Sequence, residues 1–386
     1  MSLLAARRPE VDLDRVRTAL GAVHDPEIGR PLAELGMLGE ITARRGHVRV
    51  GVRLTTASCP LVDELRHAVT TVVSVEAGVR DVEVAFTAMA PRERAEFADR
   101  LKQAAPPLTA ALGIGGTRVY AIASGKGGVG KSTVTANLAV ALAAQGKRVG
   151  VLDADVWGYS MPQLFGVRRN PVVLGELMLP VPAHGVGLMS IGFFVDEERP
   201  VIWRGPMLHK ALQQFVTDTY WGRLDALLVD LPPGTGDATL SLLEFLPDTT
   251  LLAVTTPQTT ATVVAARVAR MAAELGVPLA GVIENMTAAV CGSCGEHTAI
   301  FGTGGGSVLA QAAGAPLLGQ VPLDVELREA GDRGVPVVVD APDSASAREL
   351  ARIATALPTP QRTLAGRALP LSVVARPAPN PDVRSM

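Results

Sequence analysis

The residues best suited to chemistry lie in one glycine-rich stretch near residue 130. It fits the pattern GxxxxGK[ST], directly after the apolar run 119–123 and before a helix-compatible stretch from Ser132 to Gln145. Glycines let successive backbone N–H groups turn toward phosphate oxygens, and the following helix adds the positive end of its dipole. The final lysine and hydroxyl suit the β/γ-phosphates and Mg²⁺. We therefore predict a phosphate loop with Lys131 in catalysis and Ser132 as the magnesium ligand, which binds nucleotide through Gly125, Lys126, Gly127, Gly128, Val129, Gly130, Lys131, Ser132 and Thr133.

Two aspartates stand at the ends of apolar segments downstream. Asp153 follows the run 148–152, and Asp230 follows 227–229. Carboxylates at such positions suit Mg²⁺, and we expect Asp153 and Asp230 to hold it through its waters, in roles that could be exchanged. We expect the N–H of Gly234, in the next turn, to contact the γ-phosphate. The glycines also fit GxGxxG, with Asp153 where a dinucleotide fold places its ribose-binding acid, but that alternative does not explain Lys131 or the Asp230 segment.

Three cysteines in 386 residues are too few for a disulfide scaffold. Cys291 and Cys294 form a CxxC pair, a spacing used by zinc sites, redox dithiols and iron–sulfur ligands. Its place in a glycine-rich segment late in the chain disfavours a thioredoxin-like role. Two thiolates do not complete a four-coordinate site, whereas a symmetric homodimer supplies four. We predict a site that bridges two chains, and the thiolate count leaves zinc and a [4Fe–4S] cluster equally open.

Two further residues are candidate metal ligands or reactive groups. His297, three residues after Cys294, is an alternative third ligand in a zinc-type knuckle. Cys59 precedes Pro60 at the apparent start of a helix, where the helix dipole would lower the pKa of the thiol. An inert, buried thiol is the alternative for Cys59.

Composition limits the class of protein. An apolar fraction of 48% with 19% charged residues excludes a mainly disordered chain. The net charge of −2 indicates no general attraction to nucleic acid or anionic lipid. No apolar run reaches the ~18 residues that a membrane-spanning helix needs. We expect a cytoplasmic protein without a nucleic-acid or membrane partner.

Hydrophobic patterning divides the chain into a small α+β domain at 1–104, a linker at 105–116, an α/β domain at 117–358 and a proline-rich tail at 359–386. In the first domain we expect helices at 11–22, 60–77 and 91–104, a hairpin of strands 38–44 and 47–54, and a strand near 82–86. From residue 117 short apolar runs alternate with helical stretches, which is typical of a mostly parallel sheet flanked by helices. Strands are expected at 117–123, 148–152, 186–191, 226–230, 249–255, 278–284 and 316–320.

These segments carry a family resemblance. Lys126 gives the form KGGVGKS, that of the deviant Walker A group of P-loop ATPases, which includes partition and division-site ATPases and the nitrogenase iron protein. Within this group the chain resembles the Mrp/ApbC/Nbp35 iron–sulfur cluster carriers over roughly 115–345, through segments 153–160, 203–206, 230–237, 284–286 and 300–305 and the CxxC pair. The leading part, through 25–28 and 55–60, looks like the MIP18-type domain fused in front of many bacterial members.

The resemblance implies a P-loop NTPase fold and a function. It implies an ATP-hydrolysing carrier that holds an iron–sulfur cluster across a homodimer and transfers the cluster to apoproteins. We predict that the cluster is [4Fe–4S]. Iron–sulfur assembly proteins are the further partners that the resemblance implies. In the deviant group the lysine at the position of Lys126 reaches the partner's phosphates. We expect Asp155 to orient the attacking water, and Asn285 resembles the family's adenine contact. Tyr159 and Gly292 depart from prolines common in the family, but neither change removes a charged or ligating group.

Two other functions stay open at this point. One is a ParA/MinD-like positioning ATPase, and the other is a zinc-stapled nucleotide-binding scaffold without transfer activity. Membrane recruitment of positioning ATPases uses a basic amphipathic C-terminal helix, which the proline-interrupted tail does not offer.

Overall fold

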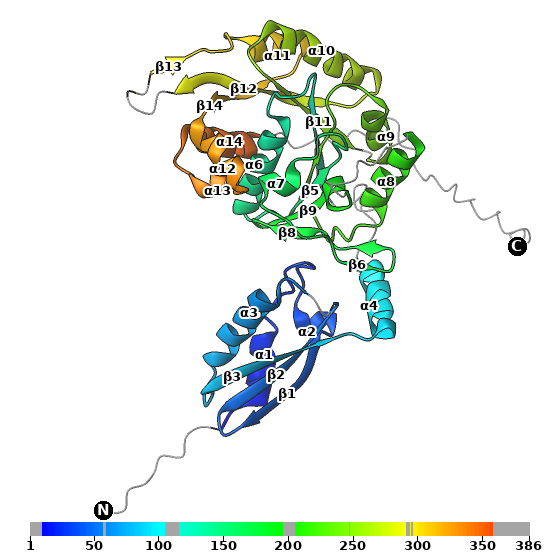
Figure 1. Cartoon of the computed structure of the whole chain (residues 1–386), viewed down its shortest axis with the longest axis vertical. Helices are drawn as coiled ribbons and strands as arrows, with labels where there is room; N and C mark the ends of the chain where they lie inside the picture. The colour runs from blue at the N-terminus through cyan, green and yellow to red at the C-terminus, as the bar shows by residue number, and fades with distance from the viewer. Residues whose placement is uncertain are drawn as a thin grey trace, which may run out of the picture.

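The computed structural model describes residues 10–56, 59–104, 116–195, 205–246, 248–290, 294 and 296–357. These residues form two lobes, which meet where helix α4 (Pro91–Ala104) lies beside the short strand β6 (Val173–Leu174) (Figure 1). Apart from Gly116, the predicted linker lies outside the described residues, and so does the predicted tail from 359 onward. Among the described helices, none is long and apolar enough to cross a membrane.

The N-terminal lobe is a three-stranded sheet with helices packed against it. Val48, Val50 and Val52 alternate along β2 and are fully buried, which fixes the face of the sheet that carries the core. β1 and β2 form the predicted antiparallel hairpin, and β3 runs parallel to β2 after a crossover through α3. The elements are α1 (Leu13–Leu20), α2 (Leu32–Leu35), β1 (Leu38–Arg44), β2 (His47–Leu54), α3 (Val62–Ser74), β3 (Asp81–Ala88) and α4.

The C-terminal lobe is built on a nine-stranded sheet with the order β13-β12-β11-β4-β10-β5-β9-β8, in which β14 also pairs with β12. The strands from β12 to β9 in this order run parallel, and β13 and β8 are antiparallel edges. The strands are β4 (Arg118–Ser124), β5 (Val149–Asp153), β8 (Val181–Ala183), β9 (Val186–Ser190), β10 (Ala226–Asp230), β11 (Thr249–Thr255), β12 (Leu279–Val290), β13 (His297–Thr298) and β14 (Leu317–Leu323). β6 and β7 (Leu177–Met178) form a separate small hairpin.

Helices cover both faces of this sheet (Figure 1). On one face α6, α12 and α14 share a core with alternate strand residues such as Ile122 and Leu228. On the other face α8, α9 and α10 pack on the intervening residues, such as Val119 and Val229. The predicted fold class, a mostly parallel sheet flanked by helices after a small α+β region, is confirmed. The helices are α6 (Lys131–Ala144), α7 (Met161–Leu164), η1 (Ile191–Phe193), α8 (Gly205–Thr217), α9 (Asp237–Phe245), α10 (Thr259–Glu274), α11 (Gly305–Ala313), α12 (Val325–Arg333), α13 (Val337–Asp340) and α14 (Ala345–Ala356).

The predicted strands of this lobe are all present, and each begins within one residue of its predicted start. The predicted end of β12 at residue 284 is wrong, because the strand continues to Val290. The apolar pattern stops at Glu284 and Asn285, whose polar side chains are nevertheless buried. Strands β6, β7, β8 and β13 were not predicted, since segments of two or three residues carry no measurable periodicity.

The two lobes share an apolar cluster. Phe97 and Leu101 of α4 belong to the same buried cluster as Leu177 of the β6–β7 hairpin and Tyr220, which follows α8. Beside this cluster, Glu27 of the N-terminal lobe and Arg169 of the C-terminal lobe form an ion pair of 2.8 Å. Helix α4 therefore contributes buried residues to the contact between the lobes.

Candidate nucleotide site and dithiol hairpin

The predicted phosphate loop connects β4 to α6 at the carboxyl edge of the parallel sheet, where α/β folds bind ligands. Gly128 and Gly130 both have φ of 79°, a conformation that glycine adopts without strain, and Gly130 caps α6. The loop lines a cavity of about 470 Å³. Predicted residues on its wall are Gly127, Gly128, Gly130, Lys131, Ser132, Thr133 and Asp155.

Asp230 lies at the base of this site, where three side chains donate to the oxygens of its carboxylate. It is fully buried, and its Oδ2 lies 2.6 Å from both Lys131 Nζ and Ser132 Oγ. Its Oδ1 accepts a hydrogen bond of 2.9 Å from Thr135 Oγ1. A hydroxyl and a carboxylate together at a phosphate cavity form a donor set that suits Mg²⁺, which prefers oxygen ligands. The residues present therefore fit a magnesium ion held by Ser132 and Asp230.

Asp153 lies beside Asp230, and like Asp230 it is fully buried and does not line the cavity. Its Oδ2 accepts from Ser190 Oγ at 2.8 Å and from the Met161 N–H at 3.2 Å, and its Oδ1 accepts from the Asp155 N–H. Burial, and then the charge of Asp230, raises the pKa of Asp153 well above its usual range. Its predicted contact with magnesium waters stays a prediction, and its observed contacts hold the start of α7 and the loop after β5.

Three other predicted residues lie around the phosphate loop. Asp155 is buried on the cavity wall, and desolvation raises the pKa of its carboxyl group. Lys126 Nζ donates to Gln258 Oε1 at 2.8 Å, so its side chain is directed within its own chain in this conformation. The Gly234 N–H donates to the Ser124 carbonyl at 2.9 Å. The predicted cross-dimer role of Lys126 and the γ-phosphate contact of Gly234 both require these bonds to open, and both stay predictions.

Asn285 lies against the outside of the phosphate loop. Its side chain is 2% exposed, and its Nδ2 donates to the Val129 carbonyl at 2.9 Å. Its Oδ1 is buried without a hydrogen-bond partner among the described residues, which leaves an acceptor for an adenine amine. The predicted adenine contact stays a prediction, whereas the contact with the loop is a feature that the sequence did not indicate.

The CxxC pair lies beyond the end of β12. Val290 pairs with His297 of β13, and between them stand Cys291, which is outside the described residues, and Cys294, which is exposed. His297 is exposed as well. Within the described ranges, no group of three His, Cys, Asp or Glu side chains is arranged to hold a metal ion. Of the predicted ligand pair, Cys294 is therefore exposed, in the connection from β12 to β13.

Cys59 is half-buried near the start of α3 in the N-terminal lobe. Desolvation by burial raises the pKa of its thiol, and the neighbouring Glu27 and Asp25 raise it further. The expectation of a lowered pKa is therefore wrong, because burial outweighs the hydrogen bond from the Leu61 N–H.

Sequence reasoning missed three side chains of the nucleotide site. Thr135 stands four residues after Lys131 on α6, so it faces the same side of the helix, and this spacing was the available signal. Ser190 and Gln258 contact Asp153 and Lys126 from distant strands and loops. No sequence spacing connects those pairs, since they are brought together by the sheet order alone.

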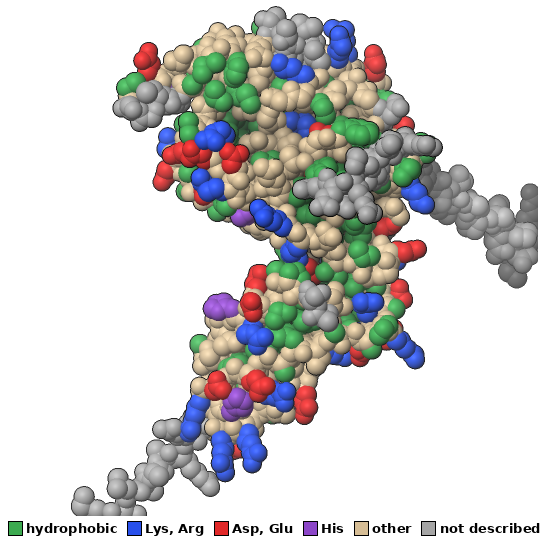
Figure 2. Space-filling model, viewed as in Figure 1, with side chains coloured by type: hydrophobic (Ala, Val, Ile, Leu, Met, Phe, Trp, Pro, Cys, Tyr) green, Lys and Arg blue, Asp and Glu red, His purple; other side chains and the backbone are tan. Residues whose placement is uncertain are grey.

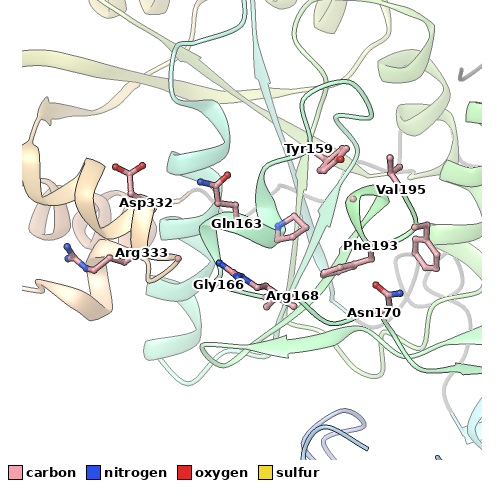
Figure 3. A pocket seen from close by; sticks show the side chains of 14 residues that line it. Tyr159, Gln163, Gly166, Arg168, Asn170, Phe193, Val195, Asp332 and Arg333 are labelled. Carbon is pink, nitrogen blue, oxygen red and sulfur yellow. The ribbon is translucent and has the colours of Figure 1, made fainter. Parts of the chain in front are cut away.

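A larger cavity of about 1070 Å³ lies on the other side of the loop after β5. Figure 3 shows Tyr159, Phe193 and Asn170 on one side of it and Asp332 and Arg333 of α12 on the other. No residue of the phosphate loop lines this cavity. We therefore assign nucleotide to the smaller cavity, which carries the phosphate-binding groups.

Charge is mixed on the surface of the protein. Figure 2 shows lysines, arginines and acidic residues interspersed over the visible face of both lobes, without a broad basic field on that face. This distribution agrees with the net charge of −2.

Comparison with known proteins gives matches over both lobes. A family model described as NUBPL iron-transfer P-loop NTPase matches residues 116–358, and one described as iron-sulfur cluster assembly protein matches residues 13–86. A relative from Mycobacterium leprae (strain TN), named iron-sulfur cluster carrier protein, is 47% identical over 365 residues, covering 92% of this chain and 95% of the relative. A relative of the same name from Synechocystis is 42% identical over 348 residues, covering 88% of this chain and 95% of the relative.

Solved structures give a further match. A nucleotide-binding protein from Archaeoglobus fulgidus in complex with ADP is 36% identical, with a TM-score of 0.50, and the match covers 62% of this chain and 91% of that one.

Proposed function

This chain belongs to the family of NUBPL-type iron-transfer P-loop NTPases, and we propose that it binds and hydrolyses ATP and carries an iron–sulfur cluster for delivery to apoproteins. The observation that best supports this proposal is the course of β12. The strand passes beside the phosphate loop at Asn285 and ends at Val290, four residues before the exposed Cys294. One strand therefore joins a nucleotide site to a pair of thiols.

The residues of the phosphate cavity suit hydrolysis by in-line attack of water. Mg²⁺, held by Ser132 and Asp230, neutralises phosphate charge when bound. Lys131 moves its ammonium group from Asp230 to the β/γ-phosphates, where it stabilises charge that develops in the transition state. Asp155, on the cavity wall, orients the water. We propose that Lys126 of each chain adds a second positive charge at the phosphates that are bound by the other chain of the dimer.

The cluster is the cargo of this carrier. Each chain offers the thiols of Cys291 and Cys294, and a [4Fe–4S] cluster takes four thiolates. A two-fold homodimer brings two pairs together and completes the ligand set. The exposure of Cys294 suits this role, because the cargo has to be reached by the recipient protein.

Anaerobic reconstitution with iron and sulfide tests the proposal. We expect a brown chromophore with about one [4Fe–4S] cluster per two chains, and a shift of the loaded protein to the dimer. Cys291→Ala and Cys294→Ala should each lose the cluster and keep nucleotide binding. Cys59→Ser is the matched control and should keep the cluster. Uptake of zinc alone by the wild type would replace the carrier with the zinc-stapled scaffold, and a full iron load in the double CxxC variant would move the ligands elsewhere.

Cytoplasmic location stays an expectation, based on the low cysteine content and on the need of free thiols for a reducing compartment. The proposed partners are a second copy of the chain, recipient apoproteins and iron–sulfur assembly proteins. A positioning ATPase is disfavoured as the alternative, since the relatives at 47% and 42% identity are both named cluster carriers.

A further inference from the structure

The two lysines of the phosphate loop are held in different ways. Lys131 lines the phosphate cavity, and its Nζ lies 2.6 Å from the buried Asp230 carboxylate. Lys126 Nζ donates to Gln258 Oε1 at 2.8 Å, and neither Lys126 nor Gln258 lines that cavity. The ammonium group of Lys126 is therefore bound to a residue beyond the loop, outside the phosphate cavity of its own chain.

The order of the sheet places Gln258 beside the start of the loop. β4 and β11 are parallel neighbours, in which Ser124 pairs with Val254. β4 ends at Ser124 and β11 ends at Thr255, so both strands end at the same edge of the sheet. Lys126 follows two residues after the first strand end, and Gln258, which caps α10, follows three residues after the second. The contact between them is therefore set by the strand register.

The backbone of Lys126 has an anchor of its own. Ser124 Oγ donates to the Lys126 carbonyl at 3.1 Å, and Ser124 is 1% exposed. This bond does not involve the Lys126 side chain. Rotation about the side-chain bonds of Lys126 is therefore enough to release Gln258, while the loop backbone keeps its position.

The acceptor that holds Lys126 is a neutral amide. An ammonium group carries a full positive charge, whereas the oxygen of a glutamine amide carries only a partial negative charge. Phosphate oxygens carry full negative charge and attract an ammonium group more strongly. The bond to Gln258 therefore holds Lys126 in the absence of phosphate and opens when phosphate comes within reach of the half-buried lysine.

From these contacts we infer that Gln258 is a positioning residue that holds Lys126 until the partner subunit brings its bound nucleotide to this lysine. The inference rests on the proposed function, in which Lys126 acts across a homodimer. While the bond is intact, Lys126 adds no charge at the phosphates of either chain. When the partner's phosphates approach, the ammonium group leaves the amide for a phosphate oxygen. Gln258 therefore keeps the second positive charge out of the reaction in the single chain.

Two substitutions of Gln258 should change the rate of phosphate release from ATP in opposite directions. Gln258→Glu keeps the shape and places a carboxylate against Lys126, so it should lower the rate about 10-fold. Gln258→Met keeps the length and removes the acceptor, so it should raise the rate about 3-fold at protein concentrations at which the wild type is partly dimeric. A purely structural role of Gln258 would lower the rate in both variants.

Salt separates a stronger bond to Lys126 from damage to the fold. Salt screens an ion pair, so the rate of Gln258→Glu relative to wild type should rise between about 50 mM and about 500 mM sodium chloride. Calorimetry should show wild-type affinity for ADP in both variants, since Gln258 does not line the cavity. Gln103→Glu, at an exposed residue of α4, is the matched control and should keep the wild-type rate at both salt concentrations.

Mixed dimers show on which chain Gln258 acts. In a dimer of one Lys126→Ala and one Lys131→Ala chain, the active site belongs to the Lys126→Ala chain and receives Lys126 from the other. Gln258→Glu added to the Lys131→Ala chain should lower the recovered activity. The same substitution added to the Lys126→Ala chain, which has no lysine at this position to hold, should leave the activity unchanged.

The outcomes separate the inference from the function on which it rests. No hydrolysis by the wild type would overturn the proposed function, and mixtures without recovery would overturn the role of Lys126 across the dimer. Where the mixture recovers, a lower rate in both Gln258→Glu and Gln258→Met, or an equal loss from Gln258→Glu in either chain, would overturn the role of Gln258 alone. Gln258→Asn, whose amide is one methylene shorter, replaces Gln258→Met if that chain does not fold, and it should also raise the rate.

Discussion

Arg169 of the C-terminal lobe and Glu27 of the N-terminal lobe form an ion pair of 2.8 Å in which Glu27 is 5% and Arg169 22% exposed. Arg169 follows α7, whose first residue, Met161, donates its N–H to Asp153 beside the nucleotide site. A short stretch of chain thus runs from the nucleotide site to the contact between the lobes.

Arg169→Ala should loosen the N-terminal lobe. The substitution leaves the Glu27 carboxylate buried without its counter-ion, which costs about 3–5 kcal/mol. Hydrogen exchange of the β1–β3 amides should accelerate, and the double variant with Glu27→Gln should recover a large part of the loss. Arg168→Ala, at the exposed neighbouring arginine, is the control. Equal exchange in Arg169→Ala and wild type would show that the apolar cluster alone holds the lobes.

The limits of sequence reasoning are visible at single residues. Strands β10 and β11 were predicted at their observed bounds because buried parallel strands are continuous apolar runs. The phosphate loop was found because its function depends on local spacing. The partners of Asp153 and Glu27 were not found, since Ser190 and Arg169 reach them only through tertiary structure. Burial of Asn285 was missed because an asparagine is normally exposed unless hydrogen bonds satisfy it.

Lys131→Ala should reduce ATP hydrolysis by at least about 100-fold. It removes the charge that stabilises the transferred phosphoryl group, and it leaves Asp230 buried without a cation. The rate of phosphate release measures the effect. Lys147→Ala is the control, since Lys147 precedes β5 at the opposite edge of the sheet. Hydrolysis at the wild-type rate in Lys131→Ala would refute the assignment of the phosphate loop.

Lys126→Ala should also abolish hydrolysis, and a mixing experiment separates a role within the chain from a role across the dimer. In a dimer of one Lys126→Ala and one Lys131→Ala chain, one of the two sites keeps its own Lys131 and receives an intact Lys126 from the partner. Random mixing of equal amounts should therefore restore about a quarter of the wild-type activity. No recovery, with dimer exchange verified, would place Lys126 in its own chain, where it now contacts Gln258.

Asp25 should make the N-terminal lobe less stable as the pH rises from about 4 to 6. Burial, opposed by hydrogen bonds from the Ile28 and Glu27 N–H groups, raises the pKa of Asp25 to about 6, and the charges of Glu27 and Glu64 add to the rise. Between the unfolded pKa and this value the folded state binds more protons than the unfolded state does, so the free energy of unfolding falls with increasing pH.

Asp25→Asn tests this prediction. The asparagine keeps an oxygen that accepts both N–H bonds and carries no charge. Urea unfolding should show it about 2 kcal/mol more stable than wild type at pH 7 and equal near pH 4. A constant difference across this range would contradict the prediction.

The fragment 1–104 should fold, but without a stable α4. Its sheet buries Val48 and Val50 of β2 against its own helices, so the core does not depend on the C-terminal lobe. Phe97 and Leu101 of α4 share their cluster with Leu177 and other residues of that lobe, which the fragment lacks. We expect a dispersed NMR spectrum in which the amides of β1–β3 are protected and those of α4 exchange rapidly. Phe97→Ser should lower the thermal stability of the full chain more than that of the fragment, because the fragment lacks Leu177 and Tyr220 of the shared cluster. Protection of α4 equal to that of the strands would show that the helix belongs to the N-terminal lobe alone, and a wholly disordered spectrum would show that the lobe needs its partner to fold.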